Sequence, residues 1–233
     1  MLVTIMGSSG SGKSTFAIKL AKAYAEKKKN TVVVFSDYYA PSFVTFFPEE
    51  VSGGSLGRLL AQPVLSKEGI QGELSPVKVS DYLVFLGYQA GENKYQYADY
   101  TKQKAEDLII ALKYLADVVI FDGQTAFYED ILTQTAAELA DTKIAIIKAD
   151  LKGLSYYKSN GSFFGQGFLL AASDPDGSNL SMEVAEEMGR SDFLLPYTAE
   201  LKKQFLEEKM FEKLSRQGKE YETVIQKIIA GIS

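Results

Sequence analysis

The feature that most constrains this chain is a glycine-rich segment between two apolar stretches. The segment, Gly7-Ser8-Ser9-Gly10-Ser11-Gly12-Lys13-Ser14, matches the pattern G-x-x-x-x-G-K-[ST] in full. An apolar run precedes it and a stretch with helical spacing follows it, so a strand, a tight loop and a helix are expected in this order. Glycines let such a loop curl until successive N–H groups point at phosphate oxygens. The segment therefore predicts a phosphate-binding loop for a nucleoside triphosphate.

Each end of the loop has an expected chemical role. Lys13 should reach the β- and γ-phosphates, and the hydroxyl of Ser14 should ligate Mg²⁺. The residues expected to contact the nucleotide, which is ATP or GTP on this evidence, are Gly7, Ser8, Ser9, Gly10, Ser11, Gly12, Lys13, Ser14 and Thr15. The alternative is a serine–glycine turn that contains a lysine by chance, which the flanking strand and helix disfavour.

Two aspartates follow apolar, β-branched runs and are further candidates. Asp122 ends the run Asp117 to Phe121, and Asp37 lies just beyond the run Thr31 to Phe35. The carboxyl ends of parallel strands form the ligand-binding edge of a sheet. Asp122 is expected to hold Mg²⁺ through water, and Asp37 to orient or deprotonate an attacking water or hydroxyl. With Lys13 they are the expected catalytic residues, although either aspartate could instead cap a turn.

Apolar strands alternate with amphipathic helices along the whole chain. This alternation predicts an α/β fold with a mainly parallel sheet flanked by helices on both faces. Because no linker divides the chain, residues 1–233 are expected to form a single nucleotide-binding domain, with an irregular segment at 40–80. The other expected strands are Tyr82 to Gly87, Lys143 to Ala149, Gly167 to Ala172 and Phe193 to Leu195, and the clearest helices are 56–60, 102–115, 129–139 and a C-terminal amphipathic helix ending near Ile232.

Composition excludes several kinds of chemistry. The chain has no Cys and no His, which rules out disulfides, thiolate or imidazole metal sites and Ser-His catalysis. A metal would be a hard cation held by oxygen, such as Mg²⁺. The net charge of −5 gives no strong nucleic-acid signal. No apolar run reaches transmembrane length, and the phosphate loop begins too close to Met1 for a signal peptide, so a cytoplasmic location is expected.

Taken together, these motifs resemble the ParA/MinD-like ATPases, a branch of the P-loop proteins that includes the pilus-assembly proteins CpaE and TadZ. The segments that carry the resemblance are GSSGSGKST, VVVF, LADVVIFDG, ELADTKIAIIKADLKGLSYY and DFLLPYTAEL. The resemblance implies binding of ATP and ADP with Mg²⁺, and a slow ATPase or nucleotide switch that positions or assembles a cellular complex. It also implies a nucleotide-dependent homodimer and a protein partner that the sequence does not identify.

The chain departs from this family at three places. Ser8 stands where the family has a lysine that reaches across a nucleotide-sandwich dimer. Asp37 stands alone where the family has two aspartates, and Asp122-Gly123-Gln124 replaces D-x-P. These departures predict slow ATP turnover, while the parts needed for nucleotide binding are intact.

Two other functions compete with this one. The segments SDYY and ADVVIFDGQTAFY resemble small-molecule kinases of the uridine-kinase type, in which Asp37 would be the catalytic base. Such kinases use lid arginines to stabilise the transferring phosphoryl group, and this chain has no arginine between Arg58 and Arg190. That gap and the Leu-Pro-Tyr segment favour the ParA/MinD-like interpretation. A nucleotide-binding scaffold without turnover fits the same features.

Overall fold

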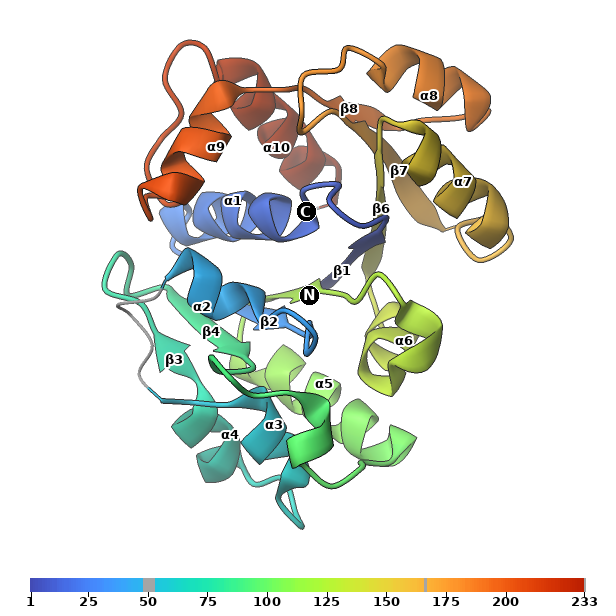
Figure 1. Ribbon diagram of the computed structural model, residues 1–233. Helices are drawn as coiled ribbons and strands as arrows, with labels where there is room; N and C mark the ends of the chain where they lie inside the picture. Colours follow the sequence, from blue (N-terminus) through green and yellow to red (C-terminus); the bar gives the residue numbers. More distant parts are fainter. Residues whose placement is uncertain (48–52, 166, 233) are drawn as a thin grey trace. The chain divides into compact units, whose positions relative to one another are not determined.

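The computed structural model describes residues 1–47, 53–165 and 167–232, and its strands and helices alternate as the sequence predicts (Figure 1). The strands are β1 (Leu2–Gly7), β2 (Thr31–Phe35), β3 (Ser75–Pro76), β4 (Leu83–Gly87), β5 (Val118–Asp122), β6 (Thr142–Lys148), β7 (Phe168–Ser173) and β8 (Phe193–Leu195). Their order in the sheet is β3-β4-β2-β5-β1-β6-β7-β8. The predicted α/β class with a mainly parallel sheet flanked by helices is confirmed.

The helices differ greatly in length. Three of them, α1 (Lys13–Glu26), α5 (Lys102–Leu115) and α10 (Lys219–Ile232), have 14 residues each. The shorter helices are α2 (Ser42–Phe46), α3 (Leu56–Ala61), α4 (Lys67–Glu73), α6 (Ile131–Glu138), α7 (Leu151–Asn160), α8 (Ser181–Glu187) and α9 (Ala199–Leu206), with 3₁₀ turns η1 (Lys94–Gln96) and η2 (Phe127–Glu129).

The contacts divide the chain into two compact units, and each is described separately below. Unit 1 consists of Met1–Thr4 and Tyr24–Asp141, and unit 2 consists of Ile5–Ala23 and everything described from Thr142 onward. The expectation of a single domain over residues 1–233 stays a prediction.

Unit 1 is built on three parallel strands. β2 pairs with β4 on one side and with β5 on the other, so that Phe35 is in register with both Gly87 and Asp122. All five residues of TVVVF are buried, as a strand with neighbours on both sides requires. Helices α3, α5 and α6 supply the apolar side chains that cover these strands, among them Leu56, Leu59, Leu108, Ile109, Leu112, Leu132 and Ala136.

Unit 2 is built on β6, β7 and β8, which are parallel neighbours. Helix α7 follows β6, and its Gly153 lies so close to the end of that strand that a Cβ there would be 2.1 Å from the carbonyl oxygen of Lys148. On α1 the ring of Phe16 stacks on Phe193 of β8, with 6.2 Å between the ring centroids. The helix that follows the glycine-rich loop is therefore fixed by buried apolar contacts within this unit.

The predicted elements agree with the structure to within one or two residues, and most of the other short elements were not predicted. The segment 40–80, expected to be irregular apart from residues 56–60, contains α2, α4 and β3 as well as α3, while its residues 48–52 lie outside the described part of the chain. Helices of five to seven residues are too short to display a period, and β3 includes Pro76, which is tolerated there at a sheet edge.

Within the described residues, no helix combines the length and the apolar character that crossing a membrane requires.

One lysine is buried inside unit 2. Lys19 of α1 is 5% exposed, and its amine donates to the side-chain oxygen of Gln204 at 2.5 Å and to the carbonyl oxygens of Met210 and Glu212 at 2.6 and 3.1 Å. Burial lowers the pKa of Lys19 to about 8. This amine joins α1 to the turn that follows α9.

We predict that Lys19→Met lowers the free energy of unfolding at pH 7 by about 1–3 kcal/mol, because buried oxygens lose their donor. The pKa of the Lys19 amine is about 8 in the folded protein and 10.5 in the unfolded chain. Between these two pH values the folded protein has lost the proton that the unfolded chain still holds. The wild type should gain stability relative to the variant across this window, by at most about 1.4 kcal/mol per pH unit. Urea unfolding measures both effects. Lys27→Met, at an exposed site just after α1, is the control. If the wild type and Lys19→Met differed in free energy of unfolding by the same amount at pH 7 and at pH 10, the prediction would be contradicted.

Candidate functional site

The loop between β1 and α1 is held against β6 by a glycine at its first position. Gly7 has φ +139°, and a Cβ there would lie 1.9 Å from the carbonyl oxygen of Ile146. Gly10 and Gly12 also have positive φ, at +66° and +86°. The first glycine is thus required by a close approach of two backbones, and the other two by the curl of the loop.

Ser8 anchors the same loop. It is 3% exposed, its backbone N–H donates to Ile146 O at 3.1 Å, and its side-chain oxygen accepts from the backbone N–H of Lys148 at 2.8 Å. The position where the family resemblance places a lysine therefore holds a short side chain that is turned inward and hydrogen-bonded to β6.

The remaining loop residues bring a lysine amine, a serine hydroxyl and the first turn of α1 to the same loop. Lys13 is the first residue of α1, and its amine folds back to donate to the carbonyl oxygen of Ser8 at 3.1 Å. The side-chain oxygen of Ser11 is buried without a hydrogen-bond partner among the described residues. Helix α1 begins at Lys13, so the partial positive charge of its N-terminus also lies at this loop. A triphosphate fits this arrangement, because it would supply oxygens to the loop N–H groups, to the hydroxyl and to the lysine.

A cavity of about 500 Å³ in unit 2 adjoins the loop. Its lining residues are Gly10, Gly12, Thr15, Ser173, Pro175, Asp176, Pro196, Tyr197, Thr198, Leu201, Lys202, Phe205 and Tyr221. The volume is within the range of small-molecule sites, and apolar walls with a few polar groups are typical of them. Of these residues, the sequence identified only Gly10, Gly12 and Thr15 as site residues, although its Leu-Pro-Tyr segment supplies Pro196 and Tyr197.

A rigid turn supports one wall of this cavity. Asp174 follows β7, and its carboxylate accepts from the backbone N–H groups of Ser178 and Asn179 at 2.8 and 2.7 Å. Burial acts to raise the pKa of Asp174, but these hydrogen bonds outweigh it and the pKa is lowered. Within the same turn, Asp176 pairs with the amine of Lys148 at 2.7 Å. Hydrogen bonds and an ion pair thus define the shape of the wall.

The two strand-end aspartates both lie in unit 1. Asp122 is the last residue of β5 and is 4% exposed, and its backbone carbonyl accepts from the N–H and the hydroxyl of Ser36 at 3.1 and 2.9 Å. Gln124 continues this network, because its side-chain amide donates to Ser36 O at 2.9 Å and to the Asp37 carboxylate at 3.4 Å. Asp37 and Asp122 are therefore linked through Ser36 and Gln124.

Asp37 shapes its own loop. One carboxylate oxygen accepts from the backbone N–H groups of Tyr39 and Ala40 at 2.9 and 3.0 Å, which is the geometry of an Asp-initiated turn. The turn role that the sequence left open is thus present, and a catalytic role for Asp37 stays a prediction.

The described residues contain no group of three or more His, Cys, Asp or Glu side chains arranged to hold a metal ion. A Mg²⁺ ion that accompanies a nucleotide needs no such group, because phosphate oxygens and water supply most of its ligands. The Ser14 hydroxyl, one residue inside α1, is of the right chemical kind to complete them.

Solved structures with the same fold are ParA/MinD ATPases. The cell division ATPase MinD of Pyrococcus furiosus has TM-score 0.77 and 16% identity over 98% of both chains. A ParA family ATPase of Chlorobium tepidum has TM-score 0.77 and 15% identity, also over 98% of both chains. The septum site-determining protein MinD of Pyrococcus horikoshii, complexed with Mg-ADP, has TM-score 0.73 and 15% identity over 99% of this chain and 97% of that one.

This chain therefore has the fold of the ParA/MinD ATPases, as its motifs predict. The sequence matches no protein-family model and no curated protein sequence. The narrower likeness to CpaE and TadZ stays a prediction.

We predict that Gly7→Ala lowers the free energy of unfolding by at least about 3 kcal/mol, because the new Cβ meets backbone that cannot move aside. Gly10→Ala is the matched control: its φ is also positive, but no heavy atom lies within 4 Å of the new Cβ, so it should cost only about 1–2 kcal/mol. Chemical unfolding of the two variants measures the difference. Equal losses of stability in the two variants would show that the close approach to Ile146 does not account for the cost of Gly7→Ala.

Proposed function

We propose that this chain is a ParA/MinD-like ATP-binding protein that acts as a slow ATPase or nucleotide switch in positioning or assembling a cellular complex. The observation that carries the proposal is a complete phosphate-binding loop, with its glycines at positive φ, next to a cavity of about 500 Å³ in the same unit. The shared fold with ParA and MinD ATPases supports it.

The nucleotide would use the loop and the cavity together. The N–H groups of residues 7–15 and the amine of Lys13 would hold the phosphates. The flat apolar walls at Pro196 and Tyr197 suit a purine ring, and Ser173, Asp176 and Lys202 offer polar contacts to the sugar or base. The choice of ATP over GTP draws on the family resemblance and on the Mg-ADP complex of the Pyrococcus horikoshii MinD.

Bound Mg²⁺ would neutralise charge on the phosphates. In this proposal the Ser14 hydroxyl is its direct protein ligand, and Asp122 acts on it through water. The role of Asp122 rests on its place at the end of a buried parallel strand and on the resemblance.

Three features support slow turnover. The Ser8 hydroxyl is hydrogen-bonded to the Lys148 N–H of β6, and a serine brings no positive charge to the transition state. The chain has no arginine between Arg58 and Arg190, so it lacks an internal arginine finger there; such a group contributes about 10³ to 10⁵ in rate. One oxygen of Asp37 is already used by its own turn. Nucleotide binding requires none of these three.

A slow ATPase is suited to switching, because a nucleotide needs only different affinities for two states to shift their populations. We propose that ATP and ADP control the formation of a homodimer, or binding to a protein partner, in the cytoplasm. A scaffold that binds nucleotide without turnover, and a small-molecule kinase, are separated from this function by the assays below.

We predict that Lys13→Ala abolishes tight Mg-ATP binding while the protein remains folded, because the variant loses the cation at the β- and γ-phosphates. Isothermal titration measures binding, and circular dichroism checks the fold. Lys27→Ala, which removes an exposed lysine just after α1, should bind as the wild type does. If Lys13→Ala bound Mg-ATP with unchanged affinity, the proposed nucleotide site would be wrong.

We predict that the isolated protein turns over ATP more slowly than about 1 s⁻¹, below ordinary kinases and enzymes. We also expect its sedimentation velocity to differ between ATP, ADP and no nucleotide. Phosphate release is measured with and without added nucleosides. ADP production that depends on a nucleoside would identify a kinase, and tight binding with no product would identify a scaffold. An unchanged sedimentation profile would remove the homodimer and leave only partner binding.

A further inference from the structure

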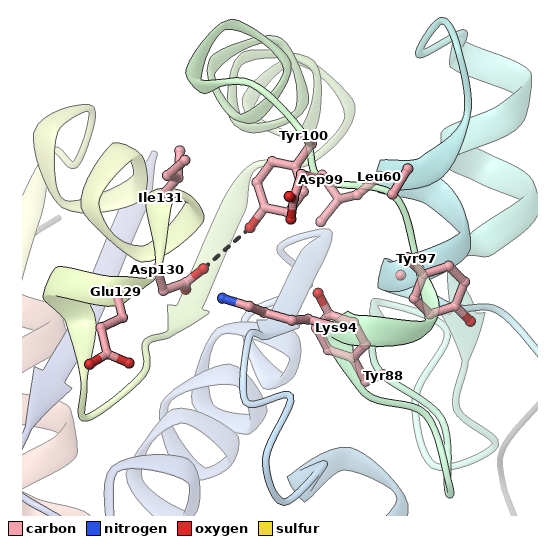
Figure 2. A pocket seen from close by; sticks show the side chains of 11 residues that line it. Leu60, Tyr88, Lys94, Tyr97, Asp99, Tyr100, Glu129, Asp130 and Ile131 are labelled. Atoms are coloured by element: carbon pink, nitrogen blue, oxygen red, sulfur yellow. Dashed lines mark hydrogen bonds between the residues drawn. The ribbon is translucent and has the colours of Figure 1, made fainter.

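Unit 1 contains a second cavity that the nucleotide function does not use (Figure 2). It has a volume of about 330 Å³ and lies between α3, η1, the segment that leads into α5, and η2. Its lining residues are Gly57, Leu60, Tyr88, Lys94, Tyr97, Ala98, Asp99, Tyr100, Glu129, Asp130 and Ile131. The volume is at the lower end of the range for small-molecule sites.

The walls of this cavity are fixed by packing and hydrogen bonds. The ring of Tyr97 lies so close to α3 that a Cβ on Gly57 would be 2.2 Å from it. The Tyr97 hydroxyl donates to Glu92 at 2.6 Å, and that carboxylate also accepts from the hydroxyl of Ser55 at 2.6 Å. On the opposite wall, Tyr100 donates to Asp130 at 3.2 Å (Figure 2). The cavity therefore has a defined shape without a ligand.

A tyrosine hydroxyl that faces the cavity forms no hydrogen bond within the described part of the protein. Tyr88 follows β4 and is 4% exposed, and its hydroxyl forms no hydrogen bond with any described residue. Figure 2 shows this hydroxyl turned toward the interior of the cavity, beside Lys94. A hydroxyl can both donate and accept a hydrogen bond, so this one is available to a polar atom of a ligand in the cavity.

The charges around the cavity favour a cation. Asp99, Glu129 and Asp130 contribute three carboxylates, and Lys94 contributes one ammonium. Burial, and then the charge of Asp130, raise the pKa values of Tyr88 and Tyr100. Asp130 caps α6 through Thr133, but its hydrogen bonds come from neutral groups and burial raises its pKa. A cation here would compensate a buried carboxylate.

Lys94 shows that an ammonium is accommodated at this place. Its amine lies 4.8 Å from the centroid of the Tyr38 ring, a cation–π distance. Figure 2 shows the side chain reaching across the cavity toward the side of Asp130. Its one hydrogen bond, to the Tyr38 hydroxyl, is long at 3.4 Å, and it forms no ion pair with any described residue. Lys94 is thus a loosely held resident cation that a ligand could displace.

We propose that this cavity binds a small organic cation that carries a guanidinium or primary ammonium group. The cation takes the position of the Lys94 amine, on the side of the Asp130 carboxylate, and a polar atom of the ligand pairs with the Tyr88 hydroxyl. The site is independent of the phosphate-binding loop, since all of its residues belong to unit 1.

The test compares three probes of similar length: agmatine as the cation, butylurea as the neutral compound and glutarate as the anion. Binding is followed by isothermal titration and by tyrosine fluorescence, which is directly visible because the chain has 14 tyrosines and no tryptophan. Agmatine should bind with a Kd on the order of 0.1 mM, as expected for a ligand of about nine heavy atoms. Butylurea and glutarate should bind at least tenfold more weakly. Absence of agmatine binding at 10 mM, or tighter binding of glutarate, would overturn the proposal.

Variants decide whether the binding occurs in this cavity. Tyr88→Phe removes only the hydroxyl, and Glu129→Gln removes an exposed charge; each should weaken agmatine about three- to tenfold. Tyr114→Phe, at a tyrosine that is 89% exposed on α5, is the control and should have no effect. Lys94→Met should tighten agmatine binding, because it removes the competing ammonium. Weaker binding in Lys94→Met, or wild-type affinity in Tyr88→Phe, would contradict the proposal.

Because Lys13→Ala leaves unit 1 unchanged, agmatine should bind this variant as it binds the wild type. Failure of the nucleotide function and failure of the cation site can therefore be told apart. Agmatine binding that disappears in Lys13→Ala would place the cation in the nucleotide site and overturn the assignment.

Discussion

The phosphate-binding loop depends on one close contact between two backbones. The end of β1 approaches β6 so closely that only a glycine fits at position 7, and Ser8 then closes two hydrogen bonds to the same strand. These contacts fix where the loop leaves the strand and hence where its N–H groups point. Without them, the glycines at positions 10 and 12 would be free to adopt many conformations, and an anion site formed from backbone amides would cost entropy to assemble.

The same contact explains how this chain departs from the family that it resembles. A lysine whose charge must leave the protomer needs an exposed side chain at position 8, whereas Ser8 is buried and its hydroxyl is occupied by the Lys148 N–H. The loop is thereby stiffened within its own unit, and the charge is lost. The proposed phosphate binding and slow hydrolysis would both follow from a serine at this position, because binding uses the backbone while hydrolysis needs added charge in the transition state.

Two aspartates in unit 1 shape the local backbone and are also candidates for the proposed sites. Asp130 caps α6 and at the same time brings a buried carboxylate to the second cavity, and Asp37 initiates its own turn at the end of β2. In both cases backbone N–H groups fix the carboxylate, so it is oriented before any ligand arrives. For Asp130 this fixed orientation is available to a ligand, whereas for Asp37 the turn occupies one of the two carboxylate oxygens.

The parts of this protein that rest on local patterns can be predicted from the sequence alone. The loop from Gly7 to Ser14 follows from the spacing of its glycines, and β2 and β5 follow from continuous β-branched runs, which only a buried parallel strand needs. Features that depend on residues distant in the sequence become visible only in the folded chain. Ser8 reads as an ordinary loop residue until Lys148 is placed beside it, and Tyr88, Lys94 and Asp130 share a cavity although more than forty positions separate the first from the last. No period or motif in the sequence predicts that these residues lie close together, because their proximity is set by how the strands and helices pack.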